Sequence, residues 1–394
     1  MVQRINKLPR PASPSTPSKF EGDYTTAHPH ILTSSHHLIF KSSHHLITTS
    51  VFFLLLFFLL PCFAQSPKYI FYFIGDGFGF GALTYSEYIA KEKGETLCFS
   101  QFPVTGLVTT HSANKLVTCS SASVTALACG EKTNNNMLGV AADSVRVLTP
   151  ISTLLHKEGF RVGIATTVSI DHATPAGFYA HSASRRSYYD IAKQIPASGF
   201  EFFAGSGFLK PEPKDSVYIF TLLRENNYVI STSISQCSGS KSFKNILIQP
   251  EGKEVKQLPY AINKNKTDFT LSQITQLGIE KLWSQNQPFF FMIEGGLIDW
   301  AAHDSLAAEL YGEVKEFSEA IEVALQFYRQ YPKETLIIVT ADHETGGAYI
   351  SNEGLQFPIG DHSGNIVPVF AIGVGAERFS GLFDNTEIVK KIWK

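Results

Sequence analysis

The stretch Phe289-Phe-Phe-Met-Ile-Glu-Gly-Gly-Leu-Ile-Asp-Trp-Ala-Ala-His303 joins an apolar run directly to acidic and imidazole side chains. Residues 289–293 are apolar at every position, which is typical of a central strand in a parallel sheet. Asp299 and His303 are four residues apart, so on one helical turn they face the same point. The stretch therefore predicts a buried strand followed by a helix that carries metal-type ligands.

Four further apolar runs have this strand character, and helical patterns separate them. Apolar residues recur at helical spacing from Leu306 to Leu325, and the pattern stops before Pro332. Alternating strands and helices predict an α/β fold, a three-layer sandwich with a central, mostly parallel sheet and helices on both faces. The other predicted strands are residues 68–74, 161–167, 335–340 and 367–373.

The composition is that of a globular protein. The chain has 394 residues, 44% of them hydrophobic, which excludes an intrinsically disordered protein. Lys and Arg total 33 against 35 Asp and Glu, a balance that gives no sign of a nucleic-acid-binding surface. Residues 65–394 are predicted to form one domain, with residues 200–287 as a more polar, variable elaboration of it.

A leader precedes this domain. Residues 51–60 are all apolar, but they are about half as long as a bilayer-spanning helix, and a small-residue pattern typical of a cleavage site ends at Ala64. We expect a signal peptide at residues 46–64, no stable membrane span after its cleavage, and a periplasmic or secreted protein. An uncleaved anchor is the alternative. Residues 1–45 are interpreted as a disordered or mis-assigned extension.

Four cysteines follow the leader: Cys98, Cys119, Cys129 and Cys237. A chain of this length needs no disulfide to fold, and Cys119 and Cys129 lie too far apart along a rigid helix to form one. Both are interpreted as buried thiols, while a disulfide between Cys98 and Cys237 is left open.

Polar side chains also follow the other predicted strands. Asp76 ends the first, Glu294 follows the run 289–293, and Asp342 and His343 follow the run 335–340. Ligands bind at the strand ends of open α/β sheets, and such groups are costly to bury without a cation. Asp342 and His343 with Asp76 suit one zinc ion, whereas Glu294 offers oxygen to a harder ion such as Mg²⁺.

A second zinc set combines Asp299 and His303 with His362, which precedes the last predicted strand. Two neighbouring zinc ions stabilise the attacking and the leaving oxygen in phosphoryl transfer. Taken singly, each of these residues has an ordinary structural explanation as a turn, a surface pair or a helix cap. Their joint placement at strand ends favours a metal site.

Residues 117–130 supply a candidate nucleophile. Small residues with Gly130 as a stop predict a short helix that begins near Ser120, where free backbone N–H groups and the helix dipole favour a phosphoryl group. A plain N-cap serine is the alternative. An arginine is needed to hold phosphate oxygens; we choose Arg185, with Arg186 or a surface role for either left open.

The chain resembles the alkaline phosphatase family across almost all of residues 67–394. Five motifs occur in the family order: Ile-Gly-Asp-Gly at 74–77, Thr-x-Ser-x-Ala-Ser-x-Thr-Ala at 118–126, Ala-Thr-Pro-Ala at 173–176, Glu-Gly-x-x-Ile-Asp-x-x-x-His at 294–303 and Thr-Ala-Asp-His-Glu at 340–344. The resemblance implies that Ser120 becomes a phosphoserine and that Arg185 holds the phosphate.

The resemblance also implies two zinc ions and one magnesium ion. Asp76 would bridge the second zinc and the magnesium, and the Ser120 oxygen would join that zinc when phosphate is absent. The implied ligands are Asp299, His303 and His362 for one zinc, Asp76, Asp342 and His343 for the other, and Asp76, Thr174 and Glu294 for magnesium.

The chain departs from the family pattern in three ways. Cys119 stands where the family commonly has Asp, which should leave Arg185 freer. His172 and Trp300 stand where some members have Asp and Lys, and this His/Trp pair resembles other bacterial members. Both are therefore candidate neighbours of the third metal or the phosphate. Only 18 residues separate His343 from His362, and this short form implies an open site and leaves a homodimer open.

These features predict an exported, metal-dependent hydrolase of small phosphate monoesters that is broad in specificity and most active at alkaline pH. A phosphodiesterase, a phosphomutase and a sulfatase are enzymes of related type. A sulfatase is disfavoured because residues 119–123 lack the arginine of its nucleophile motif. A degenerate metal-binding protein without activity is the alternative from another class.

Overall fold

The computed structural model describes residues 66–212, 217–249 and 256–393. The predicted extension at 1–45 and signal peptide at 46–64 lie outside these ranges. Within the described ranges, no helix combines the length and the apolar character that a membrane crossing requires.

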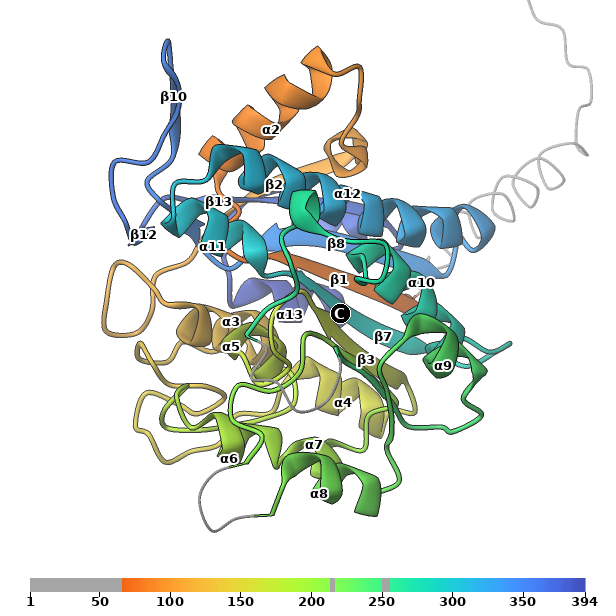
Figure 1. The fold of residues 1–394 in the computed structure, drawn as a ribbon. Coiled ribbons are helices and arrows are strands. Elements are labelled where there is room, and N and C mark those ends of the chain that lie inside the picture. The colour runs from red at the N-terminus through yellow and green to blue at the C-terminus, as the bar shows by residue number, and fades with distance from the viewer. Residues whose placement is uncertain (1–65, 213–216, 250–255, 394) are drawn as a thin grey trace, which may run out of the picture. The chain divides into compact units, whose positions relative to one another are not determined.

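A ten-stranded sheet in the order β14-β2-β13-β8-β1-β7-β3-β4-β6-β5 forms the centre of the molecule (Figure 1). Its three middle strands, β8 (Thr335–Ala341), β1 (Tyr69–Gly75) and β7 (Phe289–Gly295), are parallel and buried along their whole length. The other strands are β2 (Val104–Thr109), β3 (Arg161–Thr166), β4 (Phe202–Ala204), β5 (Val229–Ser231), β6 (Asn245–Leu247), β13 (Val367–Gly373) and β14 (Gly381–Asp384). Only β13 among these runs antiparallel to its neighbours.

Helices cover both faces of the sheet (Figure 1). The long helix α12 (Ala307–Gln330) packs on β1, β7 and β8 together with α2 (Phe80–Glu92), α10 (Leu271–Leu282) and α11 (Leu297–His303). The opposite face carries α3 (Ser120–Cys129), α4 (Ile151–Lys157), α5 (Ala173–Ala176) and α13 (Glu387–Trp393). The predicted three-layer α/β sandwich is confirmed, as are all five predicted strands.

The remaining elements are short. Two two-stranded pairs stand apart from the main sheet: β9 (Glu344–Thr345) with β12 (His362–Ser363), and β10 (Tyr349–Ser351) with β11 (Gly354–Gln356). The other helical segments are α6 (Tyr188–Ala192), α7 (Ile195–Ser198), α8 (Ile219–Glu225), α9 (Ile234–Gly239), η1 (Cys98–Gln101), η2 (Ala261–Asn263) and η3 (Ala376–Phe379).

Aromatic side chains fill the space between the sheet and α12. The ring of Phe71 meets that of Phe289 edge-on at 5.2 Å, and Phe73 meets Phe317 of α12 at 5.8 Å. Such edge-to-face pairs add to the free energy gained from burying the rings. This packing fixes α12 on the middle strands, whose carboxyl ends carry the polar residues discussed below.

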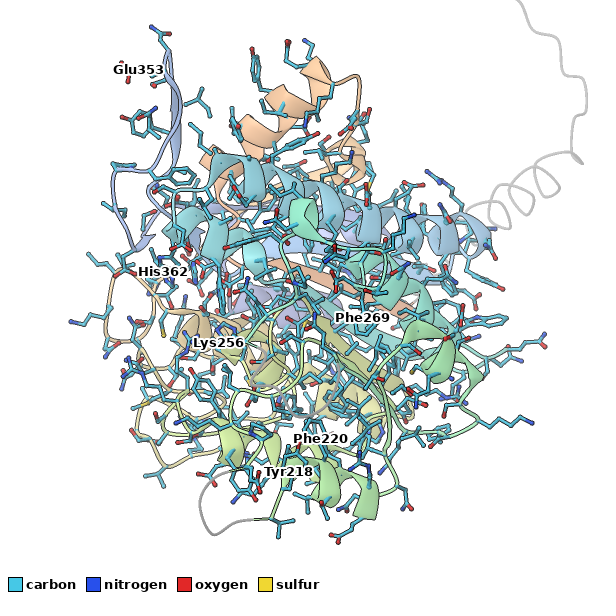
Figure 2. All side chains as sticks on the ribbon, viewed as in Figure 1. Tyr218, Phe220, Lys256, Phe269, Glu353 and His362 are labelled. Carbon is cyan, nitrogen blue, oxygen red and sulfur yellow. The ribbon has the colours of Figure 1, made fainter. Side chains whose placement is uncertain are left out.

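The polar segment 200–287 joins the same sheet. Its strands β4, β6 and β5 are parallel and extend the sheet beyond β3. Phe220 packs against Tyr218 at 4.9 Å and against Phe208 at 5.5 Å, which anchors α8 beside this edge (Figure 2).

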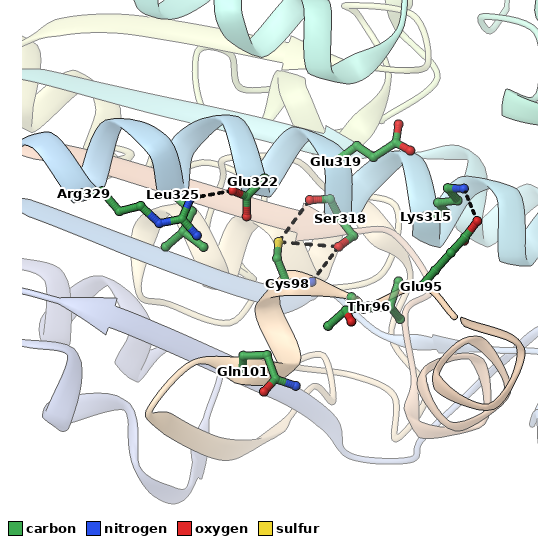
Figure 3. Close-up of a pocket in the computed structure, with 11 residues that line it drawn as sticks. Glu95, Thr96, Cys98, Gln101, Lys315, Ser318, Glu319, Glu322, Leu325 and Arg329 are labelled. Atoms are coloured by element: carbon green, nitrogen blue, oxygen red, sulfur yellow. Dashed lines mark hydrogen bonds and ion pairs between the residues drawn. The ribbon is translucent and has the colours of Figure 1, made fainter. Parts of the chain in front are cut away.

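All four cysteines of the described chain are free thiols, so the disulfide left open between Cys98 and Cys237 does not form. The Cys98 thiol instead lies 3.1 Å from the carbonyl oxygen of Ser318, in a hollow between η1 and α12 (Figure 3). The prediction that Cys119 and Cys129 are buried was wrong, because both are partly exposed: Cys119 directly precedes α3 and Cys129 is its last residue.

Helix α12 also contains a buried acid. The backbone N–H of Ala261 donates to Glu313 at 2.6 Å, and the neighbouring Glu316 forms a buried ion pair with Lys264. Burial, reinforced by the charge of Glu316, raises the pKa of Glu313 to about 8. The folded protein therefore keeps a proton here that the unfolded chain releases at a lower pH.

We expect Glu313 to make the protein less stable as pH rises from the unfolded to the folded pKa, because in that range only the unfolded chain loses the proton. Glu313→Gln stays neutral and still accepts from Ala261. Its free energy of unfolding relative to wild type should therefore rise by about 1 kcal/mol per pH unit in that window, measured by denaturant titration. Glu309→Gln, on the same helix, is the control and should show no such trend; a flat Glu313→Gln difference would contradict the prediction.

Candidate active site

The register of the middle strands brings three acidic residues to one edge of the sheet. Gly75 pairs with Gly295 on one side and with Ala341 on the other, so β1, β7 and β8 end level. Asp76 and Asp342 follow the ends of β1 and β8, and Glu294 is the penultimate residue of β7. All three side chains are buried.

The first cluster of ligand-type side chains surrounds His343. Its Nε2 atom lies 3.3 Å from Asp76 Oδ1, 3.2 Å from Asp342 Oδ2 and 3.2 Å from Ser120 Oγ. Ser120 is the first residue of α3, which ends at Gly130 with a left-handed backbone. The structure thus brings together the residues predicted for one zinc site and places the candidate nucleophile against them.

The second cluster lies beside the first. Asp299 Oδ1 is 3.4 Å from His303 Nε2 and 3.6 Å from His362 Nε2, and the ring of His362 stacks on that of His343 at 3.6 Å. The sequence did not point to Asp361, whose carboxylate lies within 4.8 Å of ligand atoms of both His303 and His362. One signal was available: Asp361 precedes His362 as Asp342 precedes His343.

A third cluster lies behind Asp76. Asp76, Glu294 and His172 each place a ligand atom within 4.8 Å of the others. Thr174, at the start of α5, is buried and lies close enough to Glu294 to lower the pKa of that carboxyl group. The residues predicted for the third metal are therefore together, and His172, predicted as a neighbour, stands among them.

Backbone carbonyl groups orient two of the histidines. His303 Nδ1 lies 3.0 Å from the carbonyl oxygen of Gly360, and His362 Nδ1 lies 3.0 Å from that of Thr118. A carbonyl oxygen only accepts, so Nδ1 carries the hydrogen in each ring and Nε2 presents its lone pair to the cluster. Metal-binding histidines in proteins are commonly held in this way.

The electrostatics of these clusters call for cations. Burial, followed by the neighbouring Asp342, raises the pKa of Asp76 well above its usual range, and burial raises that of Glu294 to about 8. Within the described chain, both carboxylate oxygens of Asp76, Oε1 of Glu294 and Oδ2 of Asp342 accept no hydrogen bond. Buried, unsatisfied carboxylate oxygens beside imidazole nitrogens fit divalent metal ions.

A cavity of about 410 Å³ opens over these clusters. Arg185 reaches it, whereas Arg186 does not line it. Two further lining residues, Lys256 and Asp304, were not indicated by any motif in the sequence. The lining residues are Ser120, His172, Arg185, Lys256, Asp299, Trp300, His303, Asp304 and His362.

Arg185 is held by His172 rather than by residue 119. Arg185 Nη2 donates to His172 Nε2 at 3.1 Å, while the Cys119 thiol lies 3.1 Å from the backbone nitrogen of Asn136. Burial, and then the charge of Arg185, lowers the pKa of His172 to about 3, so this ring is a neutral acceptor. The His172 ring meets Trp300 edge-on at 6.2 Å. Cys119 was expected to leave Arg185 freer; in the structure the neutral imidazole of His172 holds the guanidinium in place of an acidic residue at position 119.

Comparison with known proteins gives a consistent result. The family model for alkaline phosphatase matches residues 67–206 and 252–360. Alkaline phosphatase 3 of Bacillus subtilis is 26% identical, with 83% of this chain and 88% of that protein covered.

Solved structures of similar proteins include the alkaline phosphatase of the Antarctic bacterium TAB5, which is 35% identical with a TM-score of 0.76 over 84% of this chain and 97% of that one. A variant of that enzyme with one histidine replaced by glutamate holds Mg in its M3 site. The cold-active alkaline phosphatase of a Shewanella species is 28% identical with a TM-score of 0.75, over 82% of this chain and 98% of that one.

We expect Asp76→Asn to stabilise the metal-free protein by about 1–3 kcal/mol, because burial and the neighbouring Asp342 make a carboxyl group costly at this position when the ions are stripped. The same change should shrink the rise in melting temperature on adding Zn²⁺ and Mg²⁺, since a ligand shared by two clusters is lost. Thermal unfolding in chelator and in metal measures both effects.

The control for this prediction is Asp384→Asn, which removes a carboxylate outside the clusters that pairs with Lys132 at 3.0 Å. It should lower stability equally with and without metal. An Asp76→Asn protein that is less stable than wild type in chelator, yet gains as much from metal, would identify Asp76 as a structural anchor and not as a ligand.

Proposed function

The chain belongs to the alkaline phosphatase family, a family of metal-binding hydrolases, and we propose that it hydrolyses phosphate monoesters through a phosphoserine on Ser120. One observation carries the proposal. Ser120 Oγ lies 3.2 Å from His343 within a cluster of buried metal-type ligands, and Arg185 lines the same cavity.

In this proposal two zinc ions and one magnesium ion occupy the three clusters. Thr174 joins the magnesium ligands, with His172 beside them. When bound, the ions neutralise the buried carboxylates and stabilise negative charge on the attacking and leaving oxygens. The proposed ligands are Asp299, His303 and His362 for one zinc, Asp76, Asp342 and His343 for the other, and Asp76, Thr174 and Glu294 for magnesium.

The residues of the chain have defined parts in the reaction. Ser120 Oγ attacks phosphorus, the bond to the alcohol oxygen breaks, and the alcohol leaves with the electron pair and gains a proton. Water then attacks the phosphoserine, which returns the Ser120 hydroxyl and releases inorganic phosphate. Arg185 holds two non-bridging phosphate oxygens, and the N–H groups at the start of α3 face the same group.

We also propose that the enzyme is exported. The apolar run at 51–60 and the small residues ending at Ala64 support a signal peptide. A periplasmic or secreted location would expose the enzyme to small phosphate monoesters outside the cell. The open cavity agrees with broad specificity.

We expect the zinc- and magnesium-loaded mature chain to hydrolyse an aryl phosphate monoester at least about tenfold faster than the matching diester. The reason is that the bound cations and Arg185 would stabilise the two negative charges of the monoester, whereas a diester carries only one. Ser120→Ala should lose at least a hundredfold in kcat, since the phosphoserine can no longer form. Acid quenching of wild type with ³²P-labelled substrate should trap label on Ser120. A preference for the diester would exclude the monoesterase, and full activity of Ser120→Ala would exclude the covalent route.

A further prediction concerns Cys119. Burial alone would raise the pKa of its thiol, but the backbone N–H of Asn136 and the Ser121 hydroxyl lower that pKa, with a smaller contribution from the Arg185 charge. We expect Cys119→Asp to tighten competitive inhibition by inorganic phosphate about tenfold, because a charge-assisted hydrogen bond would fix the Arg185 guanidinium. The matched control, Cys119→Asn, has nearly the size and shape of the Asp variant without its charge. An inhibition constant that stays the same in Cys119→Asp would remove this account of the substitution.

A further inference from the structure

Lys256 lines the active-site cavity but belongs to none of the ligand clusters. It is exposed, and the cavity it borders also contains Ser120 and Arg185. Among the described residues, no carboxylate lies within 4.0 Å of its ammonium group. Figure 2 shows Lys256 on the same side of the molecule as His362, another residue of the cavity wall. A lysine that has no ion-pair partner within the described part of the chain, at an opening that admits anionic substrates, calls for an explanation.

Backbone hydrogen bonds hold the main chain of Lys256 beside the segment that leads to His172. Its carbonyl oxygen accepts from the backbone N–H of Ser169 at 3.1 Å, and the next residue pairs with Val168 in an isolated bridge. Two residues on, the backbone N–H of the buried Leu258 donates to Thr167 at 2.8 Å. Residues 167–169 follow the end of β3 and continue into the loop that carries His172. Lys256 is thus fixed relative to the residues that hold Arg185.

The charges of the cavity divide between its two ends. At the buried end, Arg185 and the proposed ions face the transferred phosphoryl group. At the exposed end, the described charged groups outside the ligand clusters are Lys256 and Asp304, both exposed to solvent. Trp300, another lining residue, meets the His172 ring edge-on. The alcohol part of a substrate must occupy this exposed end, because the phosphorus lies against Ser120.

We propose that Lys256 is a specificity-determining residue that favours phosphate monoesters whose alcohol part carries a second anionic group. This inference rests on the proposed function. A carboxylate or a second phosphate on the alcohol would pair with the ammonium, and a neutral alcohol would gain nothing from it. Because the pair is exposed to solvent, it should change kcat/KM by about two- to fivefold and weaken with added salt.

The test compares 4-carboxyphenyl phosphate with its methyl ester, 4-(methoxycarbonyl)phenyl phosphate, on the metal-loaded enzyme. In Lys256→Ala, the ratio of kcat/KM for the acid to that for the ester should fall about two- to fivefold, mainly through KM of the acid. Comparing ratios between variants cancels the different reactivity of the two leaving groups. Lys256→Arg should restore the ratio, and Asp304→Asn should raise it because a like charge is removed.

Lys266→Ala is the matched control, since Lys266 is an exposed lysine of the same connecting segment that does not line the cavity. It should keep the wild-type ratio. A ratio that Lys256→Ala leaves unchanged overturns the inference, and so does an equal loss on both substrates, which would assign Lys256 to the transferred phosphate or to folding.

A binding measurement separates this inference from the proposed function. The dissociation constants of 4-carboxybenzylphosphonate and its carboxyl methyl ester can be compared by calorimetry in wild type and Lys256→Ala. If wild type hydrolyses neither phosphate ester, the proposed function fails, yet a selective loss of carboxybenzylphosphonate binding in Lys256→Ala would still support the role of Lys256. Equal affinity changes for both phosphonates would overturn it.

Discussion

Mutual repulsion among buried carboxylates is the constraint on which the rest of this structure depends. Asp76, Glu294 and Asp342 lie at the carboxyl ends of three parallel strands that end at the same level, and Asp299 lies in the first turn of α11, the helix that follows β7. Dry, like-charged groups this close cannot all be ionised without compensating cations. The fold brings these acids together because its central strands are in register, and the aromatic layer under α12 keeps them so. The rigidity of the middle of the sheet is therefore the condition for metal binding.

The same constraint explains how the histidine and arginine side chains around the carboxylates are oriented. Backbone carbonyl groups of Gly360 and Thr118 hold the two exposed-side histidines by Nδ1, so the lone pairs at Nε2 face the cluster. His172, which stays neutral, accepts a hydrogen bond from Arg185. Backbone carbonyl groups thus position two imidazole rings, and a neutral imidazole positions the guanidinium group, without further charged side chains. Because the groups that orient these side chains are neutral, they add no negative charge to that of the nearby carboxylates.

Much of the fold and of the site could be predicted from sequence, because both are encoded locally. Apolar runs such as 289–293 mark central strands, and the acidic residues just after the runs 68–74, 289–293 and 335–340 mark the ligand edge. What sequence could not give depends on contacts between distant segments. Lys256 reaches the cavity only because its segment pairs with residues 167–169, and Asp361 joins His303 only through the fold of the loop between them. The exposure of Cys119 likewise follows from where α3 begins.

The short β9–β12 pair has a consequence for how this enzyme can change over time. His362 pairs with Thr345, and the backbone N–H of Gly346 donates to Asp361, so the loop that leaves His343 and returns to His362 is closed at its base. The β10–β11 hairpin beyond this closure carries Glu353 at its far end (Figure 2). Because these contacts at the base of the loop position His362, the hairpin itself is not needed to hold that residue. Evolution can lengthen, replace or decorate it without moving a proposed metal ligand.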